Sequence, residues 1–227
     1  MISVIGGTGP QGLGIAKRLA IAGEPVIVGS RKEDKALKIV KETKEELKDY
    51  DIADMTGMAN EDAAKAGDIL ILTVPLVAQT ATLKTIKPFV EGKILIDATA
   101  PLEAAIGGKA SCILDVYEGS AAERTAHILA GCDVKVIAAF NNISNSLLLN
   151  IPNDIDCDCL MAGDDKEAKA AAKEIINKLP GVRVIDVGKL EKAHLIETIT
   201  PLLIGLNIKY KSQFGGIRIT GIPKLDE

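Results

Sequence analysis

Short, continuous apolar runs alternate along the chain with longer segments whose apolar residues recur at helical spacing. Continuous apolar runs are typical of strands that are buried on both faces. They predict strands at residues 2–5, 25–29, 52–58, 68–75, 93–97, 134–140, 156–161 and 182–187. The other segments predict helices at residues 13–20, 34–47, 60–64, 77–89, 120–130, 166–179 and 190–206. This alternation predicts an α/β fold with a doubly wound, Rossmann-type parallel sheet.

Local signals mark where several of these helices begin or break. Asn60 precedes two acidic residues and is expected to cap the short helix at residues 60–64. Ser120-Ala121-Ala122-Glu123 has the spacing of a capping box at the start of another helix. Pro201 falls inside the last predicted helix, and because proline cannot donate a backbone hydrogen bond it must kink or split that helix.

The alternation loosens beyond residue 104, and residues 214–219 return as a short extended segment. No low-complexity linker or internal repeat divides the chain. We therefore expect one dinucleotide-binding domain at residues 1–145 and a smaller C-terminal α/β extension at residues 146–227.

Three glycines, Gly7, Gly9 and Gly12, form a G-x-G-x-x-G pattern between the first strand and the first helix. In a dinucleotide-binding turn the first glycine makes the tight turn and the second lets the pyrophosphate approach the backbone. The third lets the helix pack closely on the strand. The alternative is a tight strand–helix turn without a ligand, but the position of the motif favours the dinucleotide.

The second strand ends in Ser30-Arg31-Lys32, with Lys35 one turn later, and offers no carboxylate for the ribose 2′-hydroxyl of NAD. A guanidinium binds phosphate through paired hydrogen bonds, and cations at a helix start favour a bound anion. The sequence therefore favours NADP over NAD. The alternative is that these cations form an ordinary solvated helix start.

Ligands of open α/β sheets lie beyond the carboxyl ends of the strands, where this chain offers few acid–base groups. The strand end at Asn141, Asn142, Ser144 and Asn145 can hydrogen-bond an amide but supplies no good proton donor. The two histidines, His127 and His194, are each expected to be ordinary helix residues. Asp97 either caps a turn or contacts a ligand. A partner that is itself a hydride carrier needs no such acid–base group.

Composition excludes several classes of protein. The residues are 47% hydrophobic without a tryptophan, and the net charge of −4 argues against a nucleic-acid partner. No apolar run is long enough for a membrane span, and Met1 leads directly into a strand rather than a signal sequence. Cys157 and Cys159 are one residue apart, which fits neither a redox pair nor a zinc site. We expect a cytoplasmic protein with reduced cysteines and no metal.

Motifs along nearly the whole chain resemble the NADP oxidoreductases of methanogens and related archaea that depend on coenzyme F-420, an 8-hydroxy-5-deazaflavin. The most specific of these are the stretch from Gly57 to Ala64 and Thr200-Pro201-Leu202; the others are Gly6-Gly7-Thr8-Gly9, Gly29-Ser30-Arg31 with Lys35, Leu72-Thr73-Val74-Pro75, Ala162-Gly163-Asp164-Asp165 and Glu197-Thr198-Ile199. The resemblance implies reversible hydride transfer between stacked deazaflavin and nicotinamide rings. It also implies a homo-oligomer, a dimer or a tetramer, whose C-terminal region binds deazaflavin.

The glycine motif, the strand ends and the resemblance together give two sets of expected contacts. The expected NADP contacts are Gly7, Thr8, Gly9, Pro10, Gln11, Gly12, Ser30, Arg31, Lys35, Val74, Pro75, Leu76, Thr80 and Asn145. The expected deazaflavin contacts are Asn141, Asn142, Ile143, Pro201, Gly216 and Ile217. Some members of the family carry histidine where this chain has Asn141.

Two other functions stay open at this point. An NADPH-dependent reductase of a small imine or ketone would share the glycine turn but would need a proton donor, for which His194 and Glu197 are the candidates. A non-enzymatic redox sensor would bind NADP without turnover and could use the charged helix at residues 32–49 as a partner surface.

Overall fold

The computed structural model describes residues 1–222, and their strands form one eight-stranded sheet in the order β3-β2-β1-β4-β5-β6-β7-β8. Neighbouring strands are parallel except for β6 and β7. The strands are β1 (Ile2–Ile5), β2 (Val26–Ser30), β3 (Met55–Ala59), β4 (Ile69–Leu72), β5 (Lys93–Asp97), β6 (Val134–Ala138), β7 (Cys157–Gly163) and β8 (Val182–Gly188). The doubly wound, Rossmann-type α/β fold is therefore confirmed.

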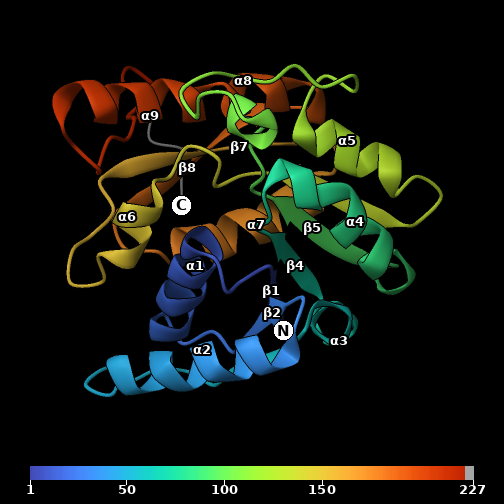
Figure 1. Cartoon of the computed structure of the whole chain (residues 1–227), viewed down its shortest axis with the longest axis vertical. Helices are drawn as coiled ribbons and strands as arrows, with labels where there is room; N and C mark the ends of the chain where they lie inside the picture. Colours follow the sequence, from blue (N-terminus) through green and yellow to red (C-terminus); the bar gives the residue numbers. More distant parts are fainter. Residues whose placement is uncertain (223–227) are drawn as a thin grey trace.

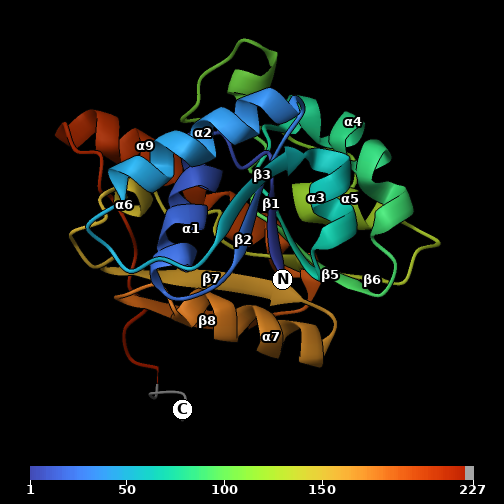
Figure 2. The ribbon, with the colours of Figure 1, turned by 90° about the horizontal axis from the view of Figure 1, so that it is seen from below.

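Helices cover both faces of the sheet (Figures 1 and 2), with α1, α2 and α6 on one side and α3, α4 and α5 on the other. The α-helices are α1 (Pro10–Ile21), α2 (Glu33–Glu46), α3 (Asn60–Ala66), α4 (Leu76–Ile86), α5 (Ala121–Ile128), α6 (Asn145–Leu149), α7 (Lys166–Asn177), α8 (Ala193–Glu197) and α9 (Ile199–Tyr210). Short 3-10 helices are η1 (Lys87–Phe89), η2 (Glu103–Ile106) and η3 (Leu190–Lys192).

Alternating side chains of the central strands fill two separate parts of the core. Val4 and Ile71 pack with α1 and α2 on one face, whereas Ile5, Leu70 and Leu72 pack with α3 and α4 on the other. Because successive side chains of a strand point to opposite faces, both faces need apolar residues. This explains why the central strands are recognisable as continuous apolar runs.

The antiparallel pairing of β7 differs from the predicted all-parallel sheet. β6 and β7 pair through Ile137 with Gly163 and through Ala138 with Ala162. The connection between them contains only the five-residue α6, which packs on α1, and no helix of this connection crosses the sheet to bring the chain back parallel to β6. β7 and β8 thus extend the same sheet. The division into two domains at residue 145 stays a prediction, and the last five residues of the predicted C-terminal extension, 223–227, lie outside the described residues.

The helix signals of the sequence are partly confirmed. Ser120 accepts a hydrogen bond from Glu123 N and begins α5, as predicted. Asn60, predicted to cap α3, instead accepts a hydrogen bond from Gly6 N over 3.1 Å, so the cap prediction is wrong. The predicted last helix is divided into η3, α8 and α9, with Pro201 in the first turn of α9, where proline is tolerated. None of the helices described in residues 1–222 has the length and apolarity to cross a membrane.

Candidate functional site

The turn between β1 and α1 is built from four glycines. Gly6 has φ +76°, in the left-handed region, so Gly6 rather than Gly7 gives the chain its sharp reversal. This corrects the role predicted for Gly7, whose N–H donates to Val4 O over 3.1 Å and whose missing Cβ leaves room for that same carbonyl. A side chain at Gly6 would be strained in φ and would collide with Val74.

The surroundings of the remaining two glycines are compatible with the roles that the motif predicts for them. A Cβ on Gly12 would overlap Thr73 Oγ1 and lie 2.7 Å from Gly7 Cα, so α1 packs closely on the turn. A Cβ on Gly9 would have no neighbour nearer than 3.6 Å, so the backbone there is open to a ligand. Because Gln11 and Gly12 lie in the first turn of α1, their N–H groups have no partner within the helix. This geometry fits a pyrophosphate.

The side chain of Gln11 joins this turn to the end of β6. Its Nε2 donates to Phe140 O and to Ile143 O, each over 3.2 Å. Phe140 is fully buried and has φ +69°, which is unusual for a residue other than glycine. Backbone held in this region by its surroundings is typical of functional sites. Gln11 therefore has a structural role besides lining the cavity.

The two asparagines after Phe140 use their amides within the protein. Asn141 Nδ2 donates to Thr99 O over 2.8 Å, and Thr200 Oγ1 donates to Asn141 O over 2.7 Å. Asn141 Oδ1 is buried and has no hydrogen-bond partner among residues 1–222. Asn142 donates to Asp158 O over 2.6 Å and accepts from Leu160 N, so its amide holds β7 beside the loop.

A cavity of about 450 Å³ opens where the glycine turn, the ends of β4, β5 and β6, and α9 meet. Nine of its lining residues were predicted as contacts: Gly9, Pro10, Gln11, Val74, Pro75, Asn141, Asn142, Ile143 and Asn145. The others are Thr73, Ala98, Thr99, Ala100, Leu102, Ser144, Thr200, Leu203, Ile204, Asn207 and Gly215. None of these side chains carries a charge or titrates near neutral pH.

The part of the lining that α9 supplies was missed by the sequence analysis. Thr200, Leu203, Ile204 and Asn207 follow the i, i+3, i+4, i+7 spacing of one helical face. That spacing was available in the sequence, but Pro201 and the uniformly apolar surroundings obscured it. Pro201 itself is buried and does not line the cavity.

Two predicted deazaflavin contacts in the tail also lie outside the cavity lining. Gly216 packs against Cys157, where an added Cβ would lie 3.2 Å from the Cys157 Cβ. Ile217 packs against the apolar cluster beneath β7 and β8. Their neighbour Gly215 lines the cavity instead, one position earlier in the tail.

A second hollow of about 510 Å³ lies at the end of β2. Its lining includes Ser30 and Arg31 from the predicted 2′-phosphate site, together with Ala59, Asn60, Glu61, Val77, Ala78, Ala81, Thr82 and Thr85. Lys35 is exposed and does not line this hollow. Leu76 is buried, and Thr80 Oγ1 accepts a hydrogen bond from Arg124 over 2.7 Å, so Val77 and Ala78 line the hollow in their place.

The buried carboxylates of this region serve the structure. Asp97 is fully buried and accepts from Thr125 Oγ1, Gln79 Nε2 and Thr99 N; because burial disfavours the charged form, the pKa of Asp97 is raised. Of its two predicted roles, Asp97 thus has the turn-capping one. Glu197 accepts from the N–H groups of Ala121 and Ala122 at the start of α5. Burial raises the pKa of Glu197 to about 8.

Both histidines lie away from the cavity. His127 and His194 are exposed on α5 and α8, and His194 Nδ1 lies 2.8 Å from Glu191 O. Neither residue, nor Glu197, lines the cavity. Within residues 1–222, no three His, Cys, Asp or Glu side chains are grouped to hold a metal ion.

The sequence of this chain matches a family of known proteins. The model of the family described as "NADP oxidoreductase coenzyme F420-dependent" matches residues 1–101. The F420-dependent NADP reductase of Methanothermobacter marburgensis is 50% identical over 223 residues, which cover 98% of this chain and 99% of that protein. The F420-dependent NADP reductase of Methanocaldococcus jannaschii is 46% identical over 222 residues, covering 97% and 98%.

Solved structures share the fold at lower identity. A structure from Arthrobacter sp. FB24 superposes with a TM-score of 0.80 at 24% identity and covers 97% of this chain and 99% of its own. A reductive aminase from Aspergillus terreus has a TM-score of 0.63 at 17% identity, covering 92% of this chain but 62% of its own. These likenesses show the fold alone, whereas the identity to the methanogen proteins extends along nearly the whole sequence. The chain belongs to the family of F420-dependent NADP reductases.

Proposed function

We propose that this chain transfers a hydride reversibly between reduced coenzyme F-420 and NADP. The observation that carries the proposal is the neutral cavity beside the glycine turn. A reaction that moves a proton to or from a substrate needs a positioned acid or base. Direct hydride transfer between two ring systems needs alignment and exclusion of water, which the uncharged, largely apolar lining supplies. The one proton that the deazaflavin ring releases on oxidation passes to solvent, and the same proton returns from solvent in the reverse reaction. When both coenzymes are bound, they supply the hydride chemistry, and the protein orients them.

For NADP, the chain offers binding groups at the glycine turn, in the cavity beside it and in the hollow at the end of β2. The open backbone at Gly9 and the first-turn N–H groups of α1 would hold the pyrophosphate. Ser30 and Arg31 would bind the 2′-phosphate in the hollow at the end of β2. The nicotinamide would enter the cavity between Pro75 and Asn145. Gly7 and Gly12 shape this turn. Direct contacts of NADP with Thr8, Lys35, Leu76 and Thr80 remain predictions.

For deazaflavin, the side of the cavity between the β6 loop and α9 is the proposed site. Asn141, Asn142 and Ile143 line that side from one direction, and Leu203 and Asn207 line it from the other. The structure supports placing Gly215, rather than Gly216 or Ile217, at the tail side of the ring. Pro201 would act indirectly, by fixing the start of α9.

A spectrophotometric assay tests the function. The purified protein is mixed with NADPH and oxidised F-420, and the deazaflavin absorbance is followed, with NADH and FMN as separate replacements. We expect loss of deazaflavin absorbance with NADPH and not with NADH. Binding of NADP without turnover in either direction would contradict the proposal and favour the non-enzymatic redox sensor. Turnover of a cyclic imine instead of F-420 would favour the imine or ketone reductase.

We also propose that the protein is a cytoplasmic homo-oligomer without a nucleic-acid partner. Leu202, Leu206 and Tyr210 lie at i, i+4 and i+8 on α9 and are 58%, 40% and 69% exposed. A helix that is apolar on its outer face as well is usually covered by another surface. Light scattering should give a dimer or a tetramer, and Leu202→Glu combined with Leu206→Glu should shift the protein towards the monomer. A monomeric wild-type protein would contradict this proposal.

A further inference from the structure

The chain turns back on itself after α9 and runs along the end of the sheet. Lys211 has φ +53°, and the following residues 212–219, here called the C-terminal strap, return towards β7. Near its start, Ser144 Oγ donates to Gln213 O over 2.8 Å, and Gly215 N donates to Asn207 Oδ1 over 2.9 Å. The strap therefore closes one side of the cavity, with Gly215 in the lining.

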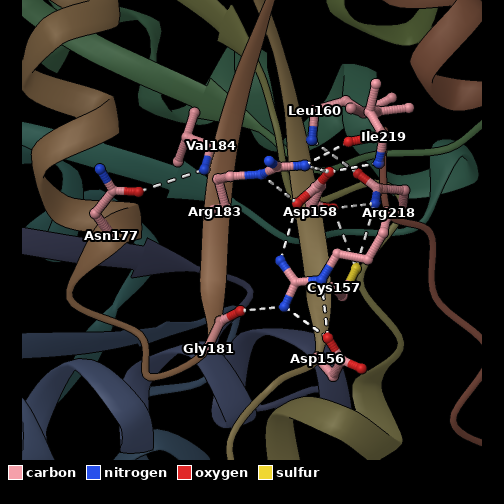
Figure 3. Close-up of polar contacts among 11 residues, drawn as sticks. Asp156, Cys157, Asp158, Leu160, Asn177, Gly181, Arg183, Val184, Arg218 and Ile219 are labelled. Atoms are coloured by element: carbon pink, nitrogen blue, oxygen red, sulfur yellow. Dashed lines mark hydrogen bonds and ion pairs between the residues drawn. The ribbon is translucent and has the colours of Figure 1, made fainter. Parts of the chain in front are cut away.

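The far end of the strap is fastened to Asp158 (Figure 3). The Asp158 side chain is fully buried in β7 and accepts from Arg218 Nη1 over 2.9 Å and from Ile219 N over 2.7 Å. From the other side, Arg183 of β8 donates to the same carboxylate from Nε and Nη2, over 2.9 and 2.6 Å. Arg183 Nη2 also donates to Ile219 O over 2.6 Å. Two guanidinium groups and one backbone N–H thus converge on one carboxylate.

The charge balance keeps this carboxylate ionised. Burial alone would raise the pKa of Asp158, but hydrogen bonds from Arg183, Ile219 and Arg218 outweigh it and lower the pKa. Compared with apolar packing, a buried ion pair adds little net stability. The two arginines instead fix the position of the strap relative to Asp158, because planar guanidinium groups bind a carboxylate in a defined orientation.

The backbone of Asp158 connects the strap to the cavity. Asp158 N donates to Ile217 O over 2.8 Å, and Asp158 O accepts from Asn142 Nδ2 over 2.6 Å. Asn142 lines the cavity, as does Gly215 at the start of the strap. Asp158 itself does not line the cavity. Asp158 therefore holds both Asn142 and the strap, two parts of the cavity wall that would contact deazaflavin. Neither of them belongs to the glycine turn.

We propose that Asp158 is a positioning residue for deazaflavin, acting through the strap and Asn142. The inference rests on the proposed function, since it concerns the same cavity. Loss of the Asp158–Arg218 pair should free the strap and misplace Gly215 and Asn142, while the glycine turn and the hollow at Ser30 and Arg31 stay intact. The effect should therefore separate the two coenzymes: F-420 should bind more weakly, and NADP should bind as before.

The test compares Arg218→Ala and Asp158→Asn with Lys169→Ala. Lys169→Ala removes an ion pair between α7 and Asp186 of β8 that does not involve the strap, so it is a matched control. Arg218→Ala leaves the Asp158–Arg183 pair in place and should fold even if Asp158→Asn does not. Three quantities are measured: KM for F-420, the dissociation constant for NADP by calorimetry, and hydrogen exchange of residues 212–219.

We expect KM for F-420 to rise about tenfold in Arg218→Ala, as for a bound group held slightly out of place. In Arg218→Ala, the NADP dissociation constant should stay within about twofold of the wild-type value, and hydrogen exchange of the strap should be faster. Arg218→Lys keeps the positive charge, so its KM for F-420 should lie between those of the wild type and Arg218→Ala. An unchanged KM for F-420 in Arg218→Ala, or equal weakening of both coenzymes, would overturn the inference. A wild-type protein without F-420 turnover would instead refute the proposed function.

Discussion

Gln11 Nε2 donates to the carbonyl oxygen of Phe140 over 3.2 Å, and the two residues are 129 positions apart in the sequence. Gln11 stands in the first turn of α1, beside the predicted pyrophosphate site, and Phe140 follows β6 on the predicted deazaflavin side. A second hydrogen bond, to Ile143 O, fixes the same loop. The hydrogen bonds therefore join the two sides of the cavity, on which the two rings must be aligned.

Replacing Gln11 with Leu keeps the size of the side chain but removes both donors. Each such hydrogen bond contributes about 0.5–1.5 kcal/mol, and its loss should let the loop at residues 140–143 move. We expect kcat/KM for F-420 to fall about tenfold because the rings are less well aligned. The dissociation constant of NADP should change less than about threefold. Steady-state kinetics and calorimetry measure the two effects, and an unchanged kcat/KM would show that the link does not matter for alignment.

Replacing Arg31 with Ala should change the choice between the two dinucleotides. Arg31 lines the hollow at the end of β2, and loss of a charged hydrogen-bond partner costs about 1.5–3 kcal/mol, or roughly ten- to a hundredfold in affinity. We expect this loss for NADP and little change for NAD, both measured by calorimetry. Lys38→Ala serves as the control, because Lys38 is an exposed cation of α2 that does not line the hollow and is not among the predicted contacts. Equal weakening of NADP and NAD would place the 2′-phosphate elsewhere.

His194→Ala should leave turnover within about twofold of the wild-type rate, because His194 is exposed and lies outside the cavity lining. A reductase of imines or ketones that used His194 as its proton donor would lose most of its activity. Rates with NADPH and F-420, measured from pH 6 to pH 8, distinguish the two possibilities. A large loss of rate would reinstate the proton-donor mechanism.

The pH dependence of stability should report on Glu197. Burial raises its pKa to about 8, so the folded protein binds this proton more tightly than the unfolded chain, whose carboxyl has a pKa of 4.5. The free energy of unfolding should therefore decrease as pH rises from 4.5 to 8, by up to about 1.4 kcal/mol per pH unit. The raised pKa of Asp97 acts in the same direction.

Glu197→Gln should flatten this decrease, measured by urea denaturation at several pH values. Replacing the exposed Glu191, which lies in η3, with Gln should leave the wild-type slope unchanged. If Glu197→Gln kept the full slope, the titrating group would have to be another residue.

Most of the fold could be predicted from local sequence patterns, whereas contacts between segments far apart in the sequence could not. The apolar runs and the glycine turn identified the parallel strands, and Ser120 identified the start of α5, because each depends on neighbouring residues. The antiparallel β7 depends on how the segment between β6 and β7 packs on α1, a contact between distant residues that the sequence pattern did not reveal.

The same distinction holds for the candidate site. The residues next to strand ends, such as Gly9 and Asn141, were found in the cavity lining. The face of α9 and the attachment of the strap to Asp158 were not predicted, because they depend on how residues 199–219 fold back over the sheet. Gln11 was predicted as a ligand contact and lines the cavity, but the hydrogen bonds of its side chain to two carbonyl groups far away in the sequence were not predicted.

The central claim is that a hydride passes directly from one ring to the other in a cavity without acid–base groups. NADPH carrying deuterium at both positions of the transferring ring carbon tests it most directly, with oxidised F-420 in ordinary water and mass spectrometry of the product. We expect reduced F-420 to carry one deuterium per molecule, because no exchange with solvent interrupts the transfer. Reduced F-420 without deuterium would contradict direct transfer and would require a proton pathway that the neutral lining does not offer.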